Sequence, residues 1–259
     1  MEREKSLQYK PLVIVDGDDT LWETAHLYRT AKDDILRLLE STGLDGASWL
    51  TSQESINVAL TRRMRLSSRQ FPESCVRAYD GLCRDLHRHP DPHVRAAILA
   101  AARKVFTTPV SVSPSTVRAL RELGKIATIV LLTKGDLAVQ VQRLQETKLS
   151  DLLDSIYIVR NEKSKATFEA IIHAYGAHAE ESWSIGNSLP SDIAPAAEAG
   201  LQCIHLAGRD TWAYENRPAL IQGTARIHTV STFADALATL RTELGRHTAP
   251  HRAAAEGLD

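Results

Sequence analysis

Three carboxylates stand together near the start of the chain, directly after a short apolar segment. Residues 12–15 are all aliphatic, and Asp16, Asp18 and Asp19 follow them, with Gly17 after the first. Carboxylates this close repel one another unless a proton or a cation offsets their charge. A hard divalent cation such as Mg²⁺ prefers oxygen ligands of this kind and completes its shell with water and phosphate oxygens. The cluster therefore indicates chemistry assisted by a divalent metal ion.

The aliphatic run predicts the element that positions this cluster. Four such residues are too few for a buried helix, which favours a strand covered on both faces of a parallel sheet. Ligands gather at the carboxyl ends of such strands. Residues 16–19 could instead form a plain hairpin turn, since Asp and Gly are frequent in turns. Residues 20–40, however, contain no second alternating strand and place apolar residues at helical spacing, so strand, loop and helix follow one another.

Composition narrows the class of ligand. The 259 residues suffice for one large domain or for a domain with an insert. The 31 basic and 32 acidic residues give no overall attraction to nucleic acid polymers or membranes, which favours a small-molecule ligand. No apolar run approaches the about 20 residues that span a bilayer, and the charged residues 1–5 lack the apolar part of a secretion signal. We expect a cytoplasmic protein, either a monomer or a homodimer.

The three cysteines offer no metal site. Cys75, Cys83 and Cys203 are too far apart in sequence to form a close ligand cluster. Their odd number favours reduced, structural thiols.

The chain has two regions with different patterns of predicted secondary structure. Residues 22–108 read as helices broken at 43–46, at Phe71-Pro72 and at 89–92, without a convincing strand. From residue 113 onward, helices alternate with short apolar strands, which is typical of a doubly wound, mostly parallel, Rossmann-like α/β sheet. Strands are predicted at 12–15, 126–132, 156–159, 183–185, 203–206 and near 227, and helices at 114–123, 136–147, 165–175, through 196–199 and at 232–244.

This alternation sets the domain boundaries. The first strand belongs with the later strands, so residues 1–21 and 109–246 form the α/β core and residues 22–108 form an all-helical insert. Residues 247–259, rich in Ala, His and Gly, are expected to be a disordered tail.

Polar residues also follow three further predicted strands. Thr133 and Lys134 stand where a helix begins, a place that suits an anion, although Thr133 could be only the helix N-cap. Lys163 precedes the helix at 165–175, where a lysine commonly faces solvent. Asn187 and Asp192 follow the strand at 183–185, and Asp192 could simply cap the next helix. Four strand ends of this kind in one chain favour a shared site.

This series resembles the four motifs of the haloacid dehalogenase-like hydrolase superfamily, over nearly the whole chain. The helical insert is similar to the helical cap of that superfamily's first subclass, the C1 type. Aspartate at both positions of the first motif resembles the phosphatases rather than the dehalogenases, whose second position is not acidic. The motifs are Asp16-x-Asp18-x-Thr20, then Thr133, then Lys163, then Gly186-Asn187-Ser188 with Asp192.

The resemblance implies roles for the acidic residues. Asp16 is expected to attack phosphorus and form an aspartyl phosphate. Asp18 is expected to donate a proton to the leaving alcohol and then take one from water, which requires neighbours that favour its protonated form. Asp19 is expected to be a bystander in the turn.

The resemblance also implies how the phosphate and the metal are held. Thr133, Lys163 and the amides of Gly17 or Lys134 are expected to bind the transferring oxygens. Lys165 competes with Lys163 for the third motif, and we prefer Lys163 because its five-residue step to Phe168 resembles the family's spacing. The expected Mg²⁺ ligands are Asp16, the Asp18 main-chain carbonyl and Asp192, with Asn187 in a position where many relatives have aspartate.

These features predict a Mg²⁺-dependent phosphomonoester hydrolase acting on a small phosphorylated metabolite. One alternative is phosphotransfer, as in sugar phosphomutases of the same superfamily, and another is a non-catalytic sensor of a phosphorylated ligand. Dehalogenase activity is a further option. Arginines outnumber acids between residues 62 and 95, which could favour a substrate with a second anionic group or could simply be a solvated helical face.

Overall fold

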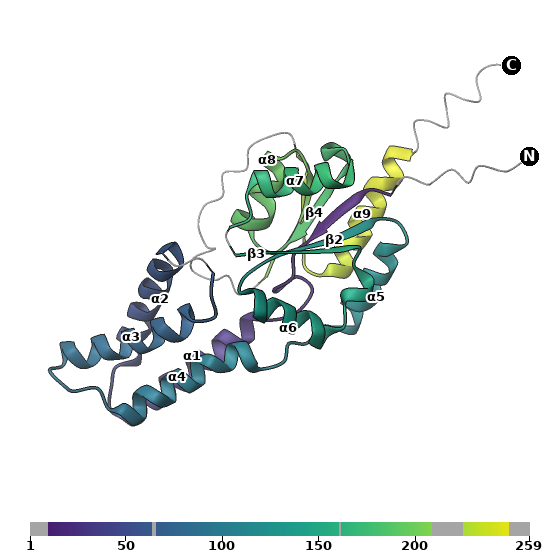
Figure 1. The fold of residues 1–259 in the computed structure, drawn as a ribbon. Helices are drawn as coiled ribbons and strands as arrows, with labels where there is room; N and C mark the ends of the chain where they lie inside the picture. The colour runs from purple at the N-terminus through teal and green to yellow at the C-terminus, as the bar shows by residue number, and fades with distance from the viewer. Residues whose placement is uncertain (1–9, 64–65, 161, 209–224, 249–259) are drawn as a thin grey trace, which may run out of the picture.

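A parallel sheet with the candidate strand at its centre forms the core of the protein. The computed structural model describes residues 10–63, 66–160, 162–208 and 225–248 (Figure 1). Six parallel strands lie in the order β3-β2-β1-β4-β5-β6, which confirms the predicted α/β class. They are β1 (Leu12–Val15), β2 (Thr128–Lys134), β3 (Ser155–Val159), β4 (Trp183–Gly186), β5 (Gln202–Leu206) and β6 (Ile227–Val230).

Strand β1 is buried on both faces, as its aliphatic run predicts. Val13 and Val15 belong to one buried cluster, and Leu12 and Ile14 belong to another. Because successive side chains of a strand point to opposite faces, the two clusters lie on opposite sides of the sheet. The helices that cover these faces are α5 (Pro114–Gly124), α6 (Leu137–Thr147) and α9 (Phe233–Thr248) on the first, and α7 (Lys165–Tyr175) and α8 (Ala194–Glu198) on the second.

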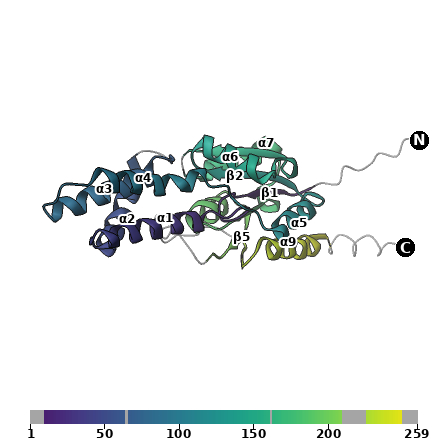
Figure 2. The same cartoon turned by 90° about the horizontal axis from the view of Figure 1, so that it is seen from below.

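The helical insert leaves the sheet directly after β1 and returns before β2. It forms an elongated unit at one end of the molecule, opposite α5 and α9 (Figures 1 and 2). Its helices are α1 (Ala25–Ser41), α2 (Gly46–Arg63), α3 (Gln70–Asp85) and α4 (Pro92–Thr107). The structure thus confirms a helical insertion between the first and second strands.

The helix break that the sequence predicts at Phe71-Pro72 lies a few residues earlier, between the end of α2 at Arg63 and the start of α3. Helix α3 begins at Gln70, and Pro72 lies in its first turn. The first N–H groups of a helix have no partner within the helix, so a proline there removes no helical hydrogen bond. Proline at this position therefore starts a helix rather than ending one.

The remaining elements are close to their predicted places. Short 3-10 turns occur at Ser150–Leu152 and Ala179–Glu181, and a π-helical turn at Leu189–Ile193 precedes α8. Helix α9 continues to Thr248, into the predicted tail, whose residues 249–259 lie outside the described part of the chain. In the described part, no helix is both long enough and apolar enough to cross a membrane.

The three cysteines are buried and carry free thiols. Burial raises the pKa of both the Cys75 and the Cys203 thiol to about 12. A thiol with so high a pKa is a weak nucleophile at neutral pH, which agrees with a structural role.

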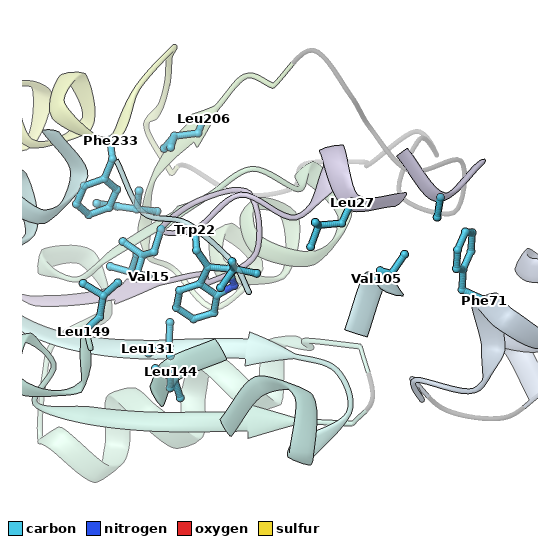
Figure 3. Close-up of a cluster of buried hydrophobic side chains, with 14 of the residues drawn as sticks. Val15, Trp22, Leu27, Phe71, Val105, Leu131, Leu144, Leu149, Leu206 and Phe233 are labelled. Atoms are coloured by element: carbon cyan, nitrogen blue, oxygen red, sulfur yellow. The ribbon is translucent and has the colours of Figure 1, made fainter. Parts of the chain in front are cut away.

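One hydrophobic cluster joins the insert to the sheet. Figure 3 shows Trp22 between sheet residues such as Val15 and Leu131 and insert residues such as Leu27 and Val105. Trp22 is 1% exposed, so its side chain is buried as fully as those of the rest of this cluster. The insert is therefore held to the sheet by packing as well as by the two chain connections.

Truncating the core of the insert is expected to destabilise the protein. Ile98 of α4 is fully buried, and Ile98→Ala removes three buried carbons. We expect the free energy of unfolding to fall by about 2–5 kcal/mol in a urea titration. The matched control is Leu137→Ala, at a side chain that is 55% exposed, with an expected change below about 0.5 kcal/mol. Equal changes in the two variants would contradict the packing of α4.

Candidate active site

The four predicted strand ends meet at one edge of the sheet. Asp16 follows β1 directly, and its N–H donates to the Ile185 carbonyl of β4 at 2.9 Å, so the residue is fixed between its neighbouring strands. Thr133 lies in β2, Lys163 precedes α7, and Asp192 lies in the turn after β4. Because the strands are parallel, these ends share one side of the sheet. The structure therefore brings together residues that are up to 176 positions apart, from Asp16 to Asp192.

Lys163 bridges two carboxylates at this edge. Its Nζ lies 2.6 Å from Asp16 Oδ1 and 2.6 Å from Asp192 Oδ1. All three side chains are buried. Two carboxylates and one ammonium leave the cluster with one excess negative charge, in surroundings that screen it poorly.

Burial and the charges of the cluster change the pKa values of Asp16 and Lys163. Burial and the nearby Asp192 carboxylate raise the pKa of Asp16 from 3.8 to about 7, although Lys163 acts in the opposite direction. Burial lowers the pKa of Lys163, but Asp16 and Asp192 outweigh it and hold that pKa above its ordinary value. The ammonium therefore stays charged, and the cluster favours an additional proton or cation.

Glycine at position 186 makes room for Asp192. A Cβ at Gly186 would lie 2.3 Å from Asp192 Oδ2, closer than side-chain carbons approach any atom. The Ser188 N–H donates to Asp192 Oδ2 at 2.9 Å, which fixes the carboxylate. Ser188 caps the turn by accepting from the Ser191 N–H, so capping by Asp192 is not observed.

Thr133 presents an unpaired hydroxyl beside the cluster. The residue is fully buried, and its Oγ1 has no hydrogen-bond partner within the described residues. Helix α6 is capped by Asp136, which accepts from the Ala138 N–H, so Thr133 is not the N-cap. Gly17 lies close by, since a Cβ there would be 3.1 Å from Thr133 Oγ1 and 2.5 Å from the Trp22 ring. A buried hydroxyl without a partner suits a ligand oxygen.

Lys134 belongs to the same edge through its side chain. Its Nζ donates to Ser191 Oγ at 2.6 Å and to Glu162 Oε2 at 3.1 Å. These contacts tie β2 to the turn that carries Asp192.

Asp18 is engaged by groups that sequence analysis does not single out. Arg143 Nη1 lies 2.8 Å from Asp18 Oδ1 and 2.7 Å from Oδ2. Gln140 Nε2 donates to Oδ2 at 3.0 Å, and Trp22 Nε1 donates to Oδ1 at 2.5 Å. Charge-assisted hydrogen bonds of this kind hold a carboxylate firmly in place. The sequence carries one signal for them: Gln140 and Arg143 are polar residues three apart on the inward face of the helix that follows the Thr133 strand.

Asp19 has a structural role in the turn after β1. Its φ of 58° is left-handed, and its carboxylate accepts from the N–H groups of Thr24 and Ala25 at 2.7 and 2.8 Å. These N–H groups are unpaired donors at the start of α1, so Asp19 anchors the first turn of the insert. These contacts give Asp19 a structural role, and its lack of a chemical role stays a prediction.

Asn187 lies at the candidate site, whereas Lys165 lies on the protein surface. Asn187 Oδ1 accepts from the Thr20 hydroxyl at 3.3 Å, beside the Asp16 loop. Lys165 is exposed and lies 3.4 Å from Glu169, on the surface of α7. The structure thus places Lys163, and not Lys165, in the cluster.

The donor set fits a magnesium ion. No group of three His, Cys, Asp or Glu side chains in the described part of the chain is arranged as a metal cluster. Mg²⁺ does not need one, because it is usually held by one or two carboxylates and keeps several waters. If the ion is bound here, Asp16 and Asp192 would supply two carboxylates, and the Asp18 main-chain carbonyl and the Asn187 amide would supply neutral oxygens. The excess negative charge of the cluster favours a cation there.

A cavity of about 550 Å³ lies between the insert and the core. Asp16, Asp18 and Asp192 line it on the core side, and Tyr28 and Phe71 line it on the insert side. Its size is that of a site for a small molecule. A ligand in this cavity can touch both the charged cluster and the helices of the insert.

The insert also contacts the loop after β2 directly. The Ser68 N–H and hydroxyl donate to Asp136 Oδ2 at 3.2 and 3.0 Å. These hydrogen bonds keep the insert against the core beside the cavity.

A family model decides which proteins this arrangement belongs with. The model of haloacid dehalogenase-like hydrolases matches residues 10–200, which include the strands β1, β2, β3 and β4 and the whole insert. The chain belongs to the haloacid dehalogenase-like hydrolase family. No curated protein matches this hydrolase.

Solved structures share the fold of this hydrolase. A haloacid dehalogenase-like family hydrolase from Xanthomonas campestris is 26% identical, with a TM-score of 0.73 over 92% of this chain and 98% of that one. The HAD-hydrolase YfnB from Bacillus subtilis, solved bound to magnesium, is 16% identical, with a TM-score of 0.58 over 90% and 99%. The L-2-haloacid dehalogenase from Xanthobacter autotrophicus, with chloropropionic acid covalently bound, is 14% identical, with a TM-score of 0.56 over 90% and 99%.

The raised pKa of Asp16 predicts how stability depends on pH. Because this pKa is about 7 in the folded hydrolase and near 3.8 in the unfolded chain, the folded state binds the extra proton between these values. Stability from this group is therefore lost as the pH rises through that window, by at most about 1.4 kcal/mol per pH unit for one proton. Asp16→Asn removes this titration.

The test compares urea titrations of Asp16→Asn and the wild type in EDTA from pH 4 to pH 8. The stability of the variant relative to the wild type is expected to rise with pH up to about 7 and then to level off. A difference that does not change with pH would show that Asp16 is not in the buried, negatively charged surroundings described above.

Proposed function

We propose that this hydrolase is a Mg²⁺-dependent phosphomonoesterase acting on a small phosphorylated metabolite. The observation that carries the proposal is the buried cluster of Asp16, Lys163 and Asp192, beside the unpaired Thr133 hydroxyl. A phosphate monoester is itself negatively charged, so it can approach Asp16 only if a cation offsets the excess charge. Mg²⁺, held by Asp16, Asp192 and the Asp18 carbonyl with Asn187 nearby, supplies that charge compensation when bound.

Asp16 and Asp18 make and break the bonds in the proposed reaction. A carboxylate oxygen of Asp16 forms a bond to phosphorus while the bond from phosphorus to the ester oxygen breaks, which gives an aspartyl phosphate. The departing alcohol takes a proton from Asp18. Water then attacks phosphorus and gives a proton to Asp18 while the bond from phosphorus to the Asp16 oxygen breaks, which releases inorganic phosphate and the free Asp16 carboxylate.

Positioning and charge balance come from the other residues. Lys163 holds Asp16 in place and faces the developing negative charge, at no cost of reorganisation during the reaction. The Thr133 hydroxyl and the amides of Gly17 and Lys134 donate hydrogen bonds to the transferring oxygens. In this assignment the unpaired Thr133 hydroxyl gains its missing partner.

The acid role of Asp18 adds one requirement. Both oxygens of Asp18 accept hydrogen bonds from Arg143, Gln140 or Trp22. Asp18 must therefore leave Arg143 when a substrate enters, so that it can carry a proton to the ester oxygen.

Dehalogenation is the second candidate. Solved haloacid dehalogenases share this fold, at 14–17% identity. Asp18 favours phosphoryl transfer, because the second residue of the motif is acidic here and can serve as an acid and base. Assays of halide release from haloacids separate the two reactions, and isomer formation in place of phosphate release would indicate a phosphomutase.

The first prediction from this function concerns turnover. With Mg²⁺ present, the protein is expected to release phosphate from a panel of phosphate monoesters, and Asp16→Asn is expected to reduce kcat roughly a thousandfold or more. Removing the metal with EDTA should abolish turnover, and adding Mg²⁺ should restore it. Equal phosphate release by the wild type and Asp16→Asn, or halide release alone, would contradict the proposal.

The second prediction concerns the metal. Gly186→Ala places a Cβ against Asp192 and is expected to weaken Mg²⁺ binding about 10- to 100-fold in isothermal titration calorimetry. Gly81→Ala is the matched control, since nothing lies within 4 Å of a Cβ at that position of α3. If both variants bound Mg²⁺ like the wild type, Asp192 would not be a ligand.

A further inference from the structure

Four buried polar side chains line the cavity with one end anchored and the other end unpaired. They are Gln53 of α2, Gln70 of α3, and Gln140 and Arg143 of α6, each at most 5% exposed. Within the described residues, Gln53 Oε1, Gln70 Nε2, Gln140 Oε1 and Arg143 Nη2 have no hydrogen-bond partner. Burying a polar group without a partner is costly, so several around one cavity indicate a ligand that pairs with them.

The orientation of Gln53 follows from its neighbours. The Ser74 hydroxyl donates its single hydrogen to the Phe71 carbonyl at 2.7 Å. Ser74 Oγ can therefore only accept from Gln53, whose Nε2 lies 2.8 Å away. The other end of the amide, Oε1, is left as a buried acceptor.

The other two amides are fixed in the same way. Gln140 Nε2 donates to Asp18 Oδ2 at 3.0 Å and to the Lys134 carbonyl at 3.2 Å, and this carbonyl can only accept. Its unpaired Oε1 is therefore an acceptor. Gln70 Oε1 accepts from the Ser67 N–H at 3.1 Å, so its unpaired Nε2 is a donor. The side chains that line the cavity thus carry two unpaired acceptors, an unpaired amide donor and an unpaired guanidinium donor, all of them buried.

Aromatic rings lie among these amides. The ring of Phe71, which follows Gln70, meets the ring of Tyr28 edge to face at 5.0 Å, and Phe106 meets Tyr28 at 6.2 Å. Tyr28 in turn lies close enough to Arg143 and Asp18 for their charges to affect its pKa, which burial raises to about 12. Donors, acceptors and apolar ring surface therefore surround one space next to Asp18.

The insert side of this cavity carries no excess of positive charge. Arg29 and Lys32 are matched there by Asp33 and Glu54, with Lys32 and Glu54 in contact at 3.0 Å. Among the described residues, the arginines of α2, α3 and α4 and of the loops before and after α3 do not line this cavity, and they are exposed; they are Arg62, Arg63, Arg69, Arg77, Arg84, Arg88, Arg95 and Arg103. Their charge thus gives no reason to expect a second anionic group on the ligand.

We propose that the alcohol part of the substrate is a neutral, hydroxyl-rich group of the sugar or polyol class, bound by Gln53, Gln70 and Gln140. The inference rests on the proposed phosphatase function. A hydroxyl both donates and accepts, so it pairs with amide oxygens and amide nitrogens alike. The C–H surface of a sugar or polyol packs on Tyr28 and Phe71. A cavity of about 550 Å³ accommodates such a monophosphate.

The test uses the ratio of kcat/KM for a hexose or pentitol monophosphate to that for p-nitrophenyl phosphate, whose leaving group has no aliphatic hydroxyls. The wild type is expected to prefer the hydroxylated ester, and also to prefer it to phosphoglycolate, which carries a second anion. Gln53→Met and Gln70→Met each keep the side-chain size but remove the amide. Each is expected to lower the ratio about tenfold.

The matched control is Gln145→Met, at an exposed glutamine of α6, which should leave the ratio unchanged. Far-ultraviolet circular dichroism and melting temperatures show that the variants fold, and the two separate substitutions guard against failure of either one. Two results would overturn the inference while leaving the phosphatase proposal intact. One is hydrolysis of p-nitrophenyl phosphate with no preference for hydroxylated esters. The other is a kcat/KM ratio that neither Gln53→Met nor Gln70→Met changes.

If no ester is hydrolysed, the phosphatase proposal fails and binding decides the inference. Calorimetric titration of the protein with Mg²⁺ and the hexose monophosphate, against phosphoglycolate, then gives the outcome. Tighter binding of the hexose monophosphate, weakened by Gln53→Met, supports a cavity that binds the hydroxyl groups of the ligand. Equal or weaker binding overturns it.

Discussion

The contact of Lys163 with both Asp16 and Asp192 is the interaction on which the site depends. Each carboxylate alone would be costly to bury, and the pair would repel each other without the ammonium between them. Burial raises the pKa of Asp16, and so does Asp192, because one lysine compensates only one of the two charges. The folded protein thus holds a buried site that favours a cation, at the edge of the sheet where we propose that a phosphate ester binds.

The surrounding structure both supports this contact and connects it to the insert. Gly186 leaves space for Asp192, and the N–H of Ser188 fixes its carboxylate. On the other side, Asp18 is held by Arg143 of α6, and Asp19 anchors the first turn of α1. The same loop therefore carries the proposed nucleophile, the proposed acid and the start of the insert. The position of the insert is thus coupled to the positions of these two carboxylates.

Much of the core could be predicted from the sequence because its signals are local. The aliphatic run of β1 and the polar residues after β1, β2 and β4 are short patterns, and parallel pairing brings such strand ends together. The contacts of Asp18 with Gln140 and Arg143 could not be predicted, since they join residues more than 120 positions apart through the packing of α6. Gln53 and Gln70 belong to the same class: a glutamine on a helix reads as a surface residue until the partner helices are in place. The break before α3 is predicted a few residues too late, at Pro72, because proline breaks a helix or starts one depending on its position within it.

The central claim is that Asp16 forms a covalent bond to phosphorus. A single-turnover reaction, with enzyme in excess over a phosphate monoester and Mg²⁺ present, can be quenched in acid and analysed by peptide mass spectrometry. The account predicts a transient phosphoryl group on the peptide that contains Asp16, lost on treatment with hydroxylamine and absent from Asp16→Asn. Rapid turnover with no such adduct, or with the phosphoryl group on another residue, would contradict it.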